Sequence, residues 1–568
     1  MTGMTRDLMR KLLFTWLLAA VLLAPLPASY AQSSASTAAT TASIKIPASA
    51  RQSAELITAA QLKDYLYFVA SDEMEGRDTP SRGLNIVAKF IALNLSRWGI
   101  KPAGDDGTFF QKIILRRSRL DPVNTQAEIN GRKFSLGEDF YASLNPGRAS
   151  GPVVYVGHGW VIKGKNIDAY RGVDIRDKIV VFYGGGLPKG ASLSDLKGSQ
   201  GSDWETPSEY AWKHGAKGAI IIPDSRVMNN LAARRQVTLE RTGSFAVAQF
   251  EPTERPQMPV ITATPAMIKA LFQGERVNGT EILSRREMAE PGDSFELSAA
   301  KRASFTVANA YEETQTQNVV GILEGSDPVL KNEYVAIGAH YDHVGMRAGT
   351  GPGDKIFNGA DDDGSGTVSV LAMAEALTHS PTRPKRSILF IWHTGEEKGL
   401  WGSQYFTEHP TVPLAQIITQ LNIDMIGRSK REGDTSAANR ALTGPNEIYV
   451  IGSKMMSTDL GNLSEAVNKS YLGLSFNYLY DNPKDPNRFF FRSDHFNYAR
   501  KGIPIIFYFD GEHEDYHKPG DSPDKIDYQK MERVARTIFV TMLELANGKS
   551  RPRVDKPLSP EVIRNSGF

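Results

Sequence analysis

Five short segments in the back half of the chain each end an apolar, strand-like run with a residue that can bind zinc. They are YVAIGAH ending at His340, NGADDDGSG around Asp362, SILFIWHTGEE ending at Glu397, LNIDMIG around Asp424 and IPIIFYFDGEHEDYH reaching His517. Ligands of open α/β sheets bind outside the carboxyl ends of the strands, so such a fold gathers these side chains around one crevice. The pattern predicts an α/β sheet that carries a two-metal hydrolase site.

The length and the absence of cysteine limit what such a site contains. At 568 residues the chain exceeds one ordinary domain, so we expect at least two. The 50 Gly and 31 Pro residues favour a loop-rich α/β enzyme, and no internal repeat is visible. Cysteine is absent, which excludes thiol nucleophiles, disulfides and Cys-type zinc sites. Any metal must therefore be held by His and carboxylates.

The first 31 residues have the features of a secretory signal peptide. Arg6, Arg10 and Lys11 precede an apolar run, and small residues follow at Ser29 and Ala31. The alternative is an uncleaved membrane anchor, but the run is short for a span of about 20 residues. We expect a secreted or periplasmic protein with no stable membrane span after cleavage.

The charge of the mature chain does not indicate a polyanionic partner. The full chain has 66 basic and 64 acidic residues, and the leader carries three basic residues and one acidic residue. Cleavage therefore leaves the charges balanced, and we expect no nucleic-acid partner.

Composition divides the rest of the chain into five parts. Residues 32–54 are rich in Ser, Ala and Thr and indicate a flexible linker. Residues 55–128 form the first part of a catalytic domain and include an amphipathic helix over 83–99. Short apolar runs between Gly and Pro turns, with a helix at SEYAWKHGA, predict a strand-rich insert over 129–285. The catalytic domain then resumes over 286–548, and 549–568 is expected to be a poorly packed tail.

The triplet Asp361-Asp362-Asp363 and the segment around His340 are the first candidate metal ligands. A two-metal site needs a bridging carboxylate, which the triplet can supply, although an acidic turn or a helix N-cap is the alternative. If the chain is extended, His340 and Asp342 point to the same side, and Asp342 can accept the proton of the His340 nitrogen that does not bind metal. His343 should then point away and be structural.

The remaining candidates are carboxylates at two further strand ends. Glu396 and Glu397 should diverge, so that one binds metal and the other acts as general base. Asp424 lies between apolar neighbours, and a buried carboxylate normally has a metal or cationic partner.

These motifs together resemble the zinc exopeptidase family that includes secreted bacterial leucine aminopeptidases, aminopeptidase Y and the glutamate carboxypeptidase group. The resemblance rests on HYDHVG, NGADDDGSG, HTGEEKGLWGSQ, NIDMIG and DYHKPGD and covers residues 55–125 and 290–548. It implies a three-layer α/β fold with a central mixed, mostly parallel sheet. The insert resembles a protease-associated domain in YRGVDIRDKIVVFYGGG and EYAWKHGAKGAIII.

The resemblance also implies two zinc ions and a role for each matching residue. Asp362 would bridge the ions, His340 and Asp424 would complete one zinc site, and Glu397 and His517 would complete the other. Glu396 would be the general base that acts on a zinc-activated water, Asp342 would orient His340, and Ser493 would lie near the site. The bond from Asp362 to Asp363 would be a cis peptide.

The implied activity is that of an aminopeptidase acting on peptides as a monomer or homodimer. The main alternative is a carboxypeptidase or dipeptidase, which needs a cationic pocket that Arg488 and Arg492 could supply. A one-zinc glutaminyl cyclase and a non-catalytic ectodomain are further alternatives. The aromatic stretch Tyr471–Arg492 could line a specificity pocket or belong to the core, and the sequence leaves the role of the insert open.

Overall fold

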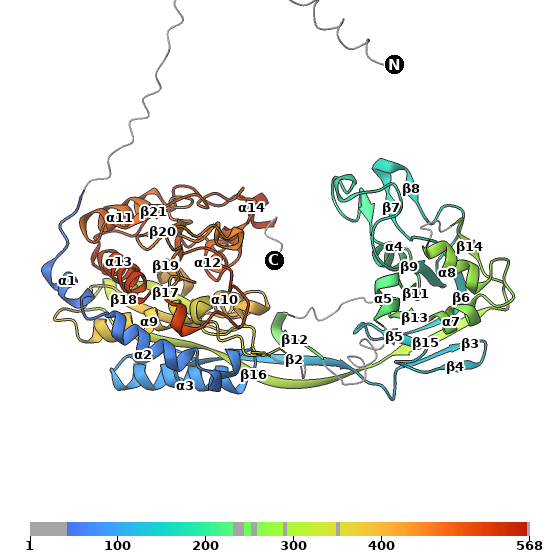
Figure 1. Cartoon of the computed structure of the whole chain (residues 1–568), viewed down its shortest axis with the longest axis horizontal. Helices are drawn as coiled ribbons and strands as arrows, with labels where there is room; N and C mark the ends of the chain where they lie inside the picture. Colours follow the sequence, from blue (N-terminus) through green and yellow to red (C-terminus); the bar gives the residue numbers. More distant parts are fainter. Residues whose placement is uncertain (1–42, 231–242, 251–257, 288–291, 348–352, 565–568) are drawn as a thin grey trace, which may run out of the picture. The chain divides into compact units, whose positions relative to one another are not determined.

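One mixed sheet carries the metal-type segments. A computed structural model describes residues 43–230, 243–250, 258–287, 292–347 and 353–564, and within these ranges the sheet has ten strands (Figure 1). Their order is β12-β2-β16-β18-β17-β19-β22-β20-β21, with β1 beside β16. The strands are β1 (Lys101–Pro102), β2 (Phe110–Leu120), β12 (Ser244–Val247), β16 (Asn309–Leu323), β17 (Tyr334–His340), β18 (Ser387–His393), β19 (Ile417–Ile423), β20 (Glu447–Ile451), β21 (Ser475–Asn477) and β22 (Ile505–Phe509).

The centre of this sheet is parallel. Strands β18, β17, β19 and β22 pair in parallel, whereas β16 and β20 pair with them in the antiparallel direction. The four parallel strands are the apolar runs that precede the metal-type residues, and they are buried on both faces. Because parallel strands share one direction, their carboxyl ends meet at one edge of the sheet, as the sequence predicts.

Helices cover both faces of the sheet, which confirms the three-layer fold. Alternate residues of β18 enter two different cores: Ile388, Phe390 and Trp392 lie on one face, and Leu389 and Ile391 on the other. The helices of the first face are α1 (Ala48–Ala54), α2 (Ala59–Val69), α3 (Arg82–Arg97), α9 (Gly366–Thr378), α11 (Thr458–Ser470) and α13 (Tyr528–Asn547). Those of the second face are α10 (Trp401–Glu408) and α12 (His495–Ala499).

A second, separate sheet forms the strand-rich insert. In the described part of the chain it has nine strands in the order β4-β3-β15-β6-β9-β11-β13-β5, with β14 beside β6. Its strands are β3 (Gln126–Ile129), β4 (Arg132–Phe134), β5 (Phe140–Ala142), β6 (Gly147–Tyr155), β9 (Ile179–Tyr183), β11 (Gly218–Ile222), β13 (Val260–Ala263), β14 (Phe295–Glu296) and β15 (Arg302–Val307). Smaller elements accompany it: β7 (Val161–Ile162), β8 (Ile167–Asp168), β10 (Trp204–Glu205), α4 (Pro207–Lys213), α5 (Ser225–Asn229), α7 (Pro265–Leu271) and α8 (Gly279–Glu287).

The boundaries of the insert differ from the predicted 129–285. Strand β15 lies between β3 and β6, so the second sheet continues to Val307. The sequence places a boundary where the apolar runs stop, but β15 alternates buried and half-exposed residues and completes the sheet by long-range pairing.

Both predicted unstructured ends of the catalytic domain are in part ordered. The signal peptide and residues 32–42 of the linker lie outside the described residues, but residues 48–54 form α1, whose Ala50 and Ala54 are buried. In the tail, Arg551 pairs with Glu333 at 2.8 Å, and α14 (Pro560–Arg564) follows. Small residues and single charges are enough to hold these segments in place, because the segments pack on the surface of the catalytic domain. Among the described helices, none is both long and apolar enough to cross a membrane.

Candidate metal centre

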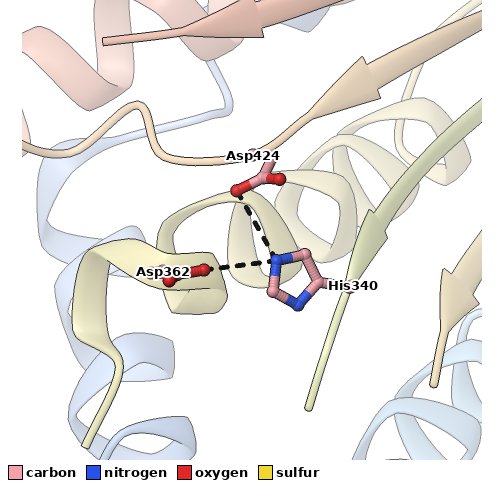
Figure 2. A group of neighbouring side chains, drawn as sticks. All are labelled: His340, Asp362 and Asp424. Atoms are coloured by element: carbon pink, nitrogen blue, oxygen red, sulfur yellow. Dashed lines mark ion pairs between the residues drawn. The ribbon is translucent and has the colours of Figure 1, made fainter. Parts of the chain in front are cut away.

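His340, Asp362 and Asp424 converge at the carboxyl edge of the parallel strands (Figure 2). His340 ends β17, Asp424 follows β19, and Asp362 lies in the turn before α9. The Nε2 atom of His340 is 3.3 Å from Oδ1 of Asp362 and 3.5 Å from Oδ1 of Asp424. All three side chains are buried, so three potential metal ligands surround one small space.

The other oxygen of Asp362 faces a second group. Its Oδ2 atom is 3.1 Å from Nε2 of His517, and the same nitrogen is 3.1 Å from Oε2 of Glu397. The two oxygens of one carboxylate therefore point to two different histidines, which is the arrangement that a bridging ligand requires. The structure brings together all five residues that the sequence proposes as ligands.

The loop that holds Asp362 is fixed by hydrogen bonds to two other carboxylates, those of Asp363 and Asp521. The Asp362–Asp363 peptide is cis, as the resemblance implies. Asp363 accepts the backbone N–H groups of Gly366 at 2.9 Å and of Met425 at 3.1 Å, so it connects the start of α9 to the segment after β19. Asp521 accepts the N–H groups of Asp361 and Asp362 at 3.1 Å each. The three aspartates thus have different tasks, and Asp362 alone faces both histidines.

Several atoms of this cluster lack a hydrogen-bond partner although they are buried. These atoms are His340 Nε2, His343 Nδ1, Asp362 Oδ2, Glu397 Oε1 and His517 Nε2. A buried polar atom without a partner costs about 1–3 kcal/mol, so such atoms normally mark a missing ligand when they gather in one place. Imidazole and carboxylate donors are the ligands that zinc accepts, and the residues present therefore fit a metal centre.

The charges of the cluster stabilise one another without a metal. Burial disfavours the charged imidazole of His340, but Asp424 and Glu396 outweigh it and hold the pKa of His340 well above its ordinary value. Burial acts in the same way on His517, but Asp362 and Glu397 raise its pKa to about 10. In the metal-free chain these histidines therefore carry protons that a metal must displace.

Glu396 and Glu397 diverge, as predicted for neighbours at a strand end. The Oε2 atom of Glu396 is 4.0 Å from Nε2 of His340, whereas Glu397 turns towards His517. Burial raises the pKa of the Glu396 carboxyl well above its ordinary value, and the charge of Glu397 adds to this effect. Glu396 thus lies beside the first ligand group as a carboxylate with raised basicity, which suits a general base.

Asp342 differs from the prediction in the group that it contacts. The Nδ1 atom of His340 is 3.2 Å from the backbone carbonyl of Asp342 and 3.7 Å from its carboxylate, which is beyond hydrogen-bond distance. The carboxylate instead accepts the backbone N–H of Glu396 at 3.1 Å. Asp342 therefore positions His340 through its carbonyl and Glu396 through its side chain.

His343 does not point away from the site, which corrects the prediction. Its side chain is fully buried, and its Nδ1 atom is 2.9 Å from Oε1 of Glu397. The prediction assumed an extended chain, but β17 ends at His340 and the alternation of sides ends with it.

Two buried residues that support the site carry no signal in the sequence. Arg77 is fully buried and donates to four backbone carbonyls, those of Val69, Tyr341, Asn358 and Gly359. His513 lies 3.3 Å from Asp361, at the loop that holds the bridging candidate. Neither contact follows from local spacing, because the partners are far apart in the chain.

Ser493 lies close to the site, as the resemblance implies. Its hydroxyl accepts the side-chain N–H of Asn422 at 2.9 Å. A further hydrogen bond from Ser493 favours the ionised form of Asp424, so it opposes the burial that raises the pKa of that carboxyl. Ser493 therefore favours the ionised form of Asp424, which is the form that binds a metal.

A pocket opens beside the first ligand group. Its lining combines carboxylates, aromatic rings and one ion pair and consists of Asp362, Glu396, Asp424, Met425, Phe489, Arg492, Phe507, Phe509, Glu512 and Tyr516. Phe489 lines the pocket and also belongs, with Phe490 and Phe491, to the core of the second face. Both interpretations of the aromatic stretch therefore hold for Phe489, whereas Phe490 and Phe491 belong to the core.

The two arginines proposed for a carboxypeptidase pocket have other partners. Arg492 lines the pocket but pairs with Glu512 at 2.7 Å, so its charge is already compensated. The Arg488 guanidinium lies over the ring of Phe491, 5.1 Å from its centre.

Part of the chain is similar in sequence to known peptidases. Residues 318–542 match the model of Peptidase family M28. A probable leucine aminopeptidase 2 of Aspergillus oryzae is 33% identical over 35% of this chain and 34% of its own length. Leucine aminopeptidase 2 of Trichophyton equinum is 25% identical over 46% of this chain and 52% of its own. The chain thus spans between a third and about half of the length of these relatives.

Among solved structures, an aminopeptidase from Aneurinibacillus sp. strain AM-1 aligns with 90% of this chain and 97% of its own. The identity is 16% and the TM-score 0.47.

Proposed function

We propose that the chain, whose residues 318–542 match the model of Peptidase family M28, is a zinc-dependent aminopeptidase that removes N-terminal residues from peptides. The observation that carries the proposal is the carboxylate of Asp362, whose two oxygens face His340 and His517 separately. The leucine aminopeptidases among the relatives favour the same activity.

The proposed centre holds two zinc ions. His340 and Asp424 would bind one ion, Glu397 and His517 the other, and Asp362 both. When bound, such ions polarise a peptide carbonyl and lower the pKa of water to about 7. Two complete groups of ligands favour this centre over the single zinc of a glutaminyl cyclase and over a non-catalytic ectodomain.

The side chains of the protein itself supply proton transfer and substrate orientation. Glu396 takes the proton of the attacking water and passes it to the leaving amine, and Asp342 holds the backbone of this base in place. The apolar walls formed by Phe489, Phe507 and Phe509 take the side chain of the N-terminal residue.

The charges of the pocket favour a free amino terminus over a free carboxyl terminus. A carboxypeptidase needs a cation that can pair with the substrate carboxylate, but the guanidinium of Arg492 is paired with Glu512. The carboxypeptidase alternative therefore requires the Arg492–Glu512 pair to open.

Mixed unblocked peptides test the proposal directly. The mature chain is incubated with them, with and without a chelator, and mass spectrometry identifies the end that shortens. We expect loss from the N-terminus that the chelator prevents. Loss from the C-terminus would establish the carboxypeptidase instead, and no trimming after addition of zinc would contradict both.

Phe489→Ala should change which N-terminal residues are accepted. Removal of the ring takes away one apolar wall of the pocket. We therefore expect kcat/KM for an N-terminal Leu or Phe to fall by roughly tenfold, with little change for an N-terminal Ala. Leu479→Ala, a change at a side chain that is 64% exposed, serves as the matched control. An equal loss for large and small N-terminal residues would show that Phe489 does not contribute to specificity.

Secretion or a periplasmic location is the proposed setting. The support is the leader pattern of residues 1–31, which predicts a mature chain that begins at Gln32. N-terminal sequencing of the protein from the secreted or periplasmic fraction tests it, and a chain that stays in the membrane fraction with Met1 intact would favour the anchor.

A further inference from the structure

We propose that His343 is a sixth metal ligand, so that the ion beside Glu397 is bound by two histidines. This inference rests on the proposed metal centre. Glu397, His517, His343 and Asp362 would form the ligand group of one ion, called here the four-residue group. His340, Asp424 and Asp362 would form the three-residue group of the other.

The distances within the four-residue group suit a common ion. The Nδ1 atom of His343 is 2.9 Å from Oε1 of Glu397 and 3.7 Å from Oδ2 of Asp362. The Nε2 atom of His517 is 3.1 Å from an oxygen of each of the same two carboxylates. Donors about 2.0–2.1 Å from a tetrahedral zinc lie about 3.3 Å from one another. The observed distances lie on both sides of this value.

The direction in which the Nδ1 atom of His343 points distinguishes a metal ligand from a hydrogen-bond donor. Nδ1 of His343 and Oε1 of Glu397 are within hydrogen-bond distance, yet both remain without a hydrogen-bond partner. A proton on Nδ1 of His343 would therefore not point at Oε1 of Glu397. Two buried atoms that approach each other without bonding are expected where both face a third partner.

The ring of His343 is held in this position by its surroundings. Gly359, at φ +57°, packs against it so closely that a Cβ atom there would lie 2.5 Å from Cγ of His343. The backbone N–H of His343 donates to the carbonyl of Arg77 at 3.2 Å. The ring of His517 stands at 75° to that of His343, with 5.6 Å between their centres. A fixed ring that faces two carboxylates suits a ligand better than a filler of the core.

The two ions would then differ in function. A ligand group that is closed by protein suits retention of the metal, whereas a group with an open position suits contact with substrate. The pocket lining includes Asp362 and Asp424 but not Glu397 or His343. The substrate pocket therefore opens towards Asp424 of the three-residue group, and the four-residue group, which has one protein ligand more, would keep its ion more tightly.

Cobalt-substituted protein provides a test that does not depend on turnover. The metal-stripped full chain is loaded with two equivalents of Co²⁺, and proton NMR counts the strongly shifted, solvent-exchangeable signals of imidazole N–H groups on ligated histidines. We expect three signals in the wild type, from His340, His343 and His517, and the loss of one in His343→Gln. His495→Gln, at another fully buried histidine, is the matched control and should keep all three.

Two signals in the wild type would overturn the proposal even if the variant fails to fold, and so would a wild-type chain that binds no cobalt. Three signals that persist in a folded His343→Gln variant would overturn it as well. Peptide trimming is measured separately. Three signals without trimming would contradict the proposed function and leave the ligand assignment intact, and trimming with two signals would do the reverse.

Discussion

Glu396→Gln is expected to lower kcat for peptides with a free N-terminus by about 10²–10⁴-fold, the contribution of a general base. The amide keeps the size of the side chain but cannot take a proton from water. Glu396 lies 4.0 Å from His340, and none of the candidate ligand pairs depends on it. The variant should therefore still bind two zinc ions, which elemental analysis measures on the same sample as the kinetics.

Glu312→Gln, an exposed change in β16, is the control and should leave both kcat and metal content unchanged. Full activity of Glu396→Gln would show that another group accepts the proton. Loss of metal together with activity would show that Glu396 is a ligand.

The sequence predicts the central sheet and the first ligands because both depend on local order. A buried parallel strand is a short apolar run, and the residue after it lies at the carboxyl edge of the sheet. Spacing alone thus places His340, Glu397 and Asp424 at one edge of the sheet. In the structure His340 lies 3.5 Å from Asp424, and Glu397 lies in the neighbouring ligand group beside His517. The cis peptide at Asp362 came from resemblance and not from spacing, because no local rule predicts it.

Other features depend on contacts that local patterns do not encode. β15 completes the second sheet by pairing with strands that lie about 150 to 180 residues earlier in the chain, so the boundary expected from composition lies too early. The alternation of sides along a strand predicts the wrong side for His343, because β17 ends at His340. Asp342 lies close to the expected place, but its carboxylate contacts a neighbouring loop that the sequence could not position.

Arg77 is a buried residue whose contacts no local sequence pattern predicts. Among the substitutions proposed here, its removal should lower the free energy of unfolding most. The side chain donates to the carbonyls of Tyr341 at 2.9 Å and Gly359 at 2.8 Å, residues on either side of the metal-type cluster. It also donates to Val69 at the end of α2. One buried guanidinium therefore connects α2 to the two loops that carry His340 and Asp362.

Charge as well as hydrogen bonding keeps this side chain in the interior. Burial lowers the pKa of Arg77, and the carboxylates of Asp342 and Asp521 oppose this effect. A planar guanidinium offers five donors in a fixed geometry, which suits four carbonyls approaching from different elements. Lysine cannot replace it, because three donors on one nitrogen do not reach all four.

Arg77→Met should lower the free energy of unfolding of the metal-free chain by about 3–5 kcal/mol, the cost of breaking a buried charged network. The variant removes a donor from four carbonyls, of which that of Gly359 still accepts the N–H of Gly364, and it leaves the nearby carboxylates without their cation. Arg77 has φ +52°, but any non-glycine replacement keeps that strain, so the comparison with methionine measures the side chain alone. Denaturant unfolding of metal-free protein gives the value without a contribution from metal binding.

Arg82→Met is the matched control, because Arg82 is an exposed arginine at the start of α3, and its effect should stay within about 0.5 kcal/mol. Arg77→Lys should fall close to methionine, because its donors do not reach all four carbonyls, and a stability close to the wild type would show that charge alone suffices. A stability of Arg77→Met within about 0.5 kcal/mol of the wild type would show that the loops around His340 and Asp362 hold their positions without the guanidinium. The preorganisation of the metal centre would then come from the carboxylate contacts of Asp363 and Asp521.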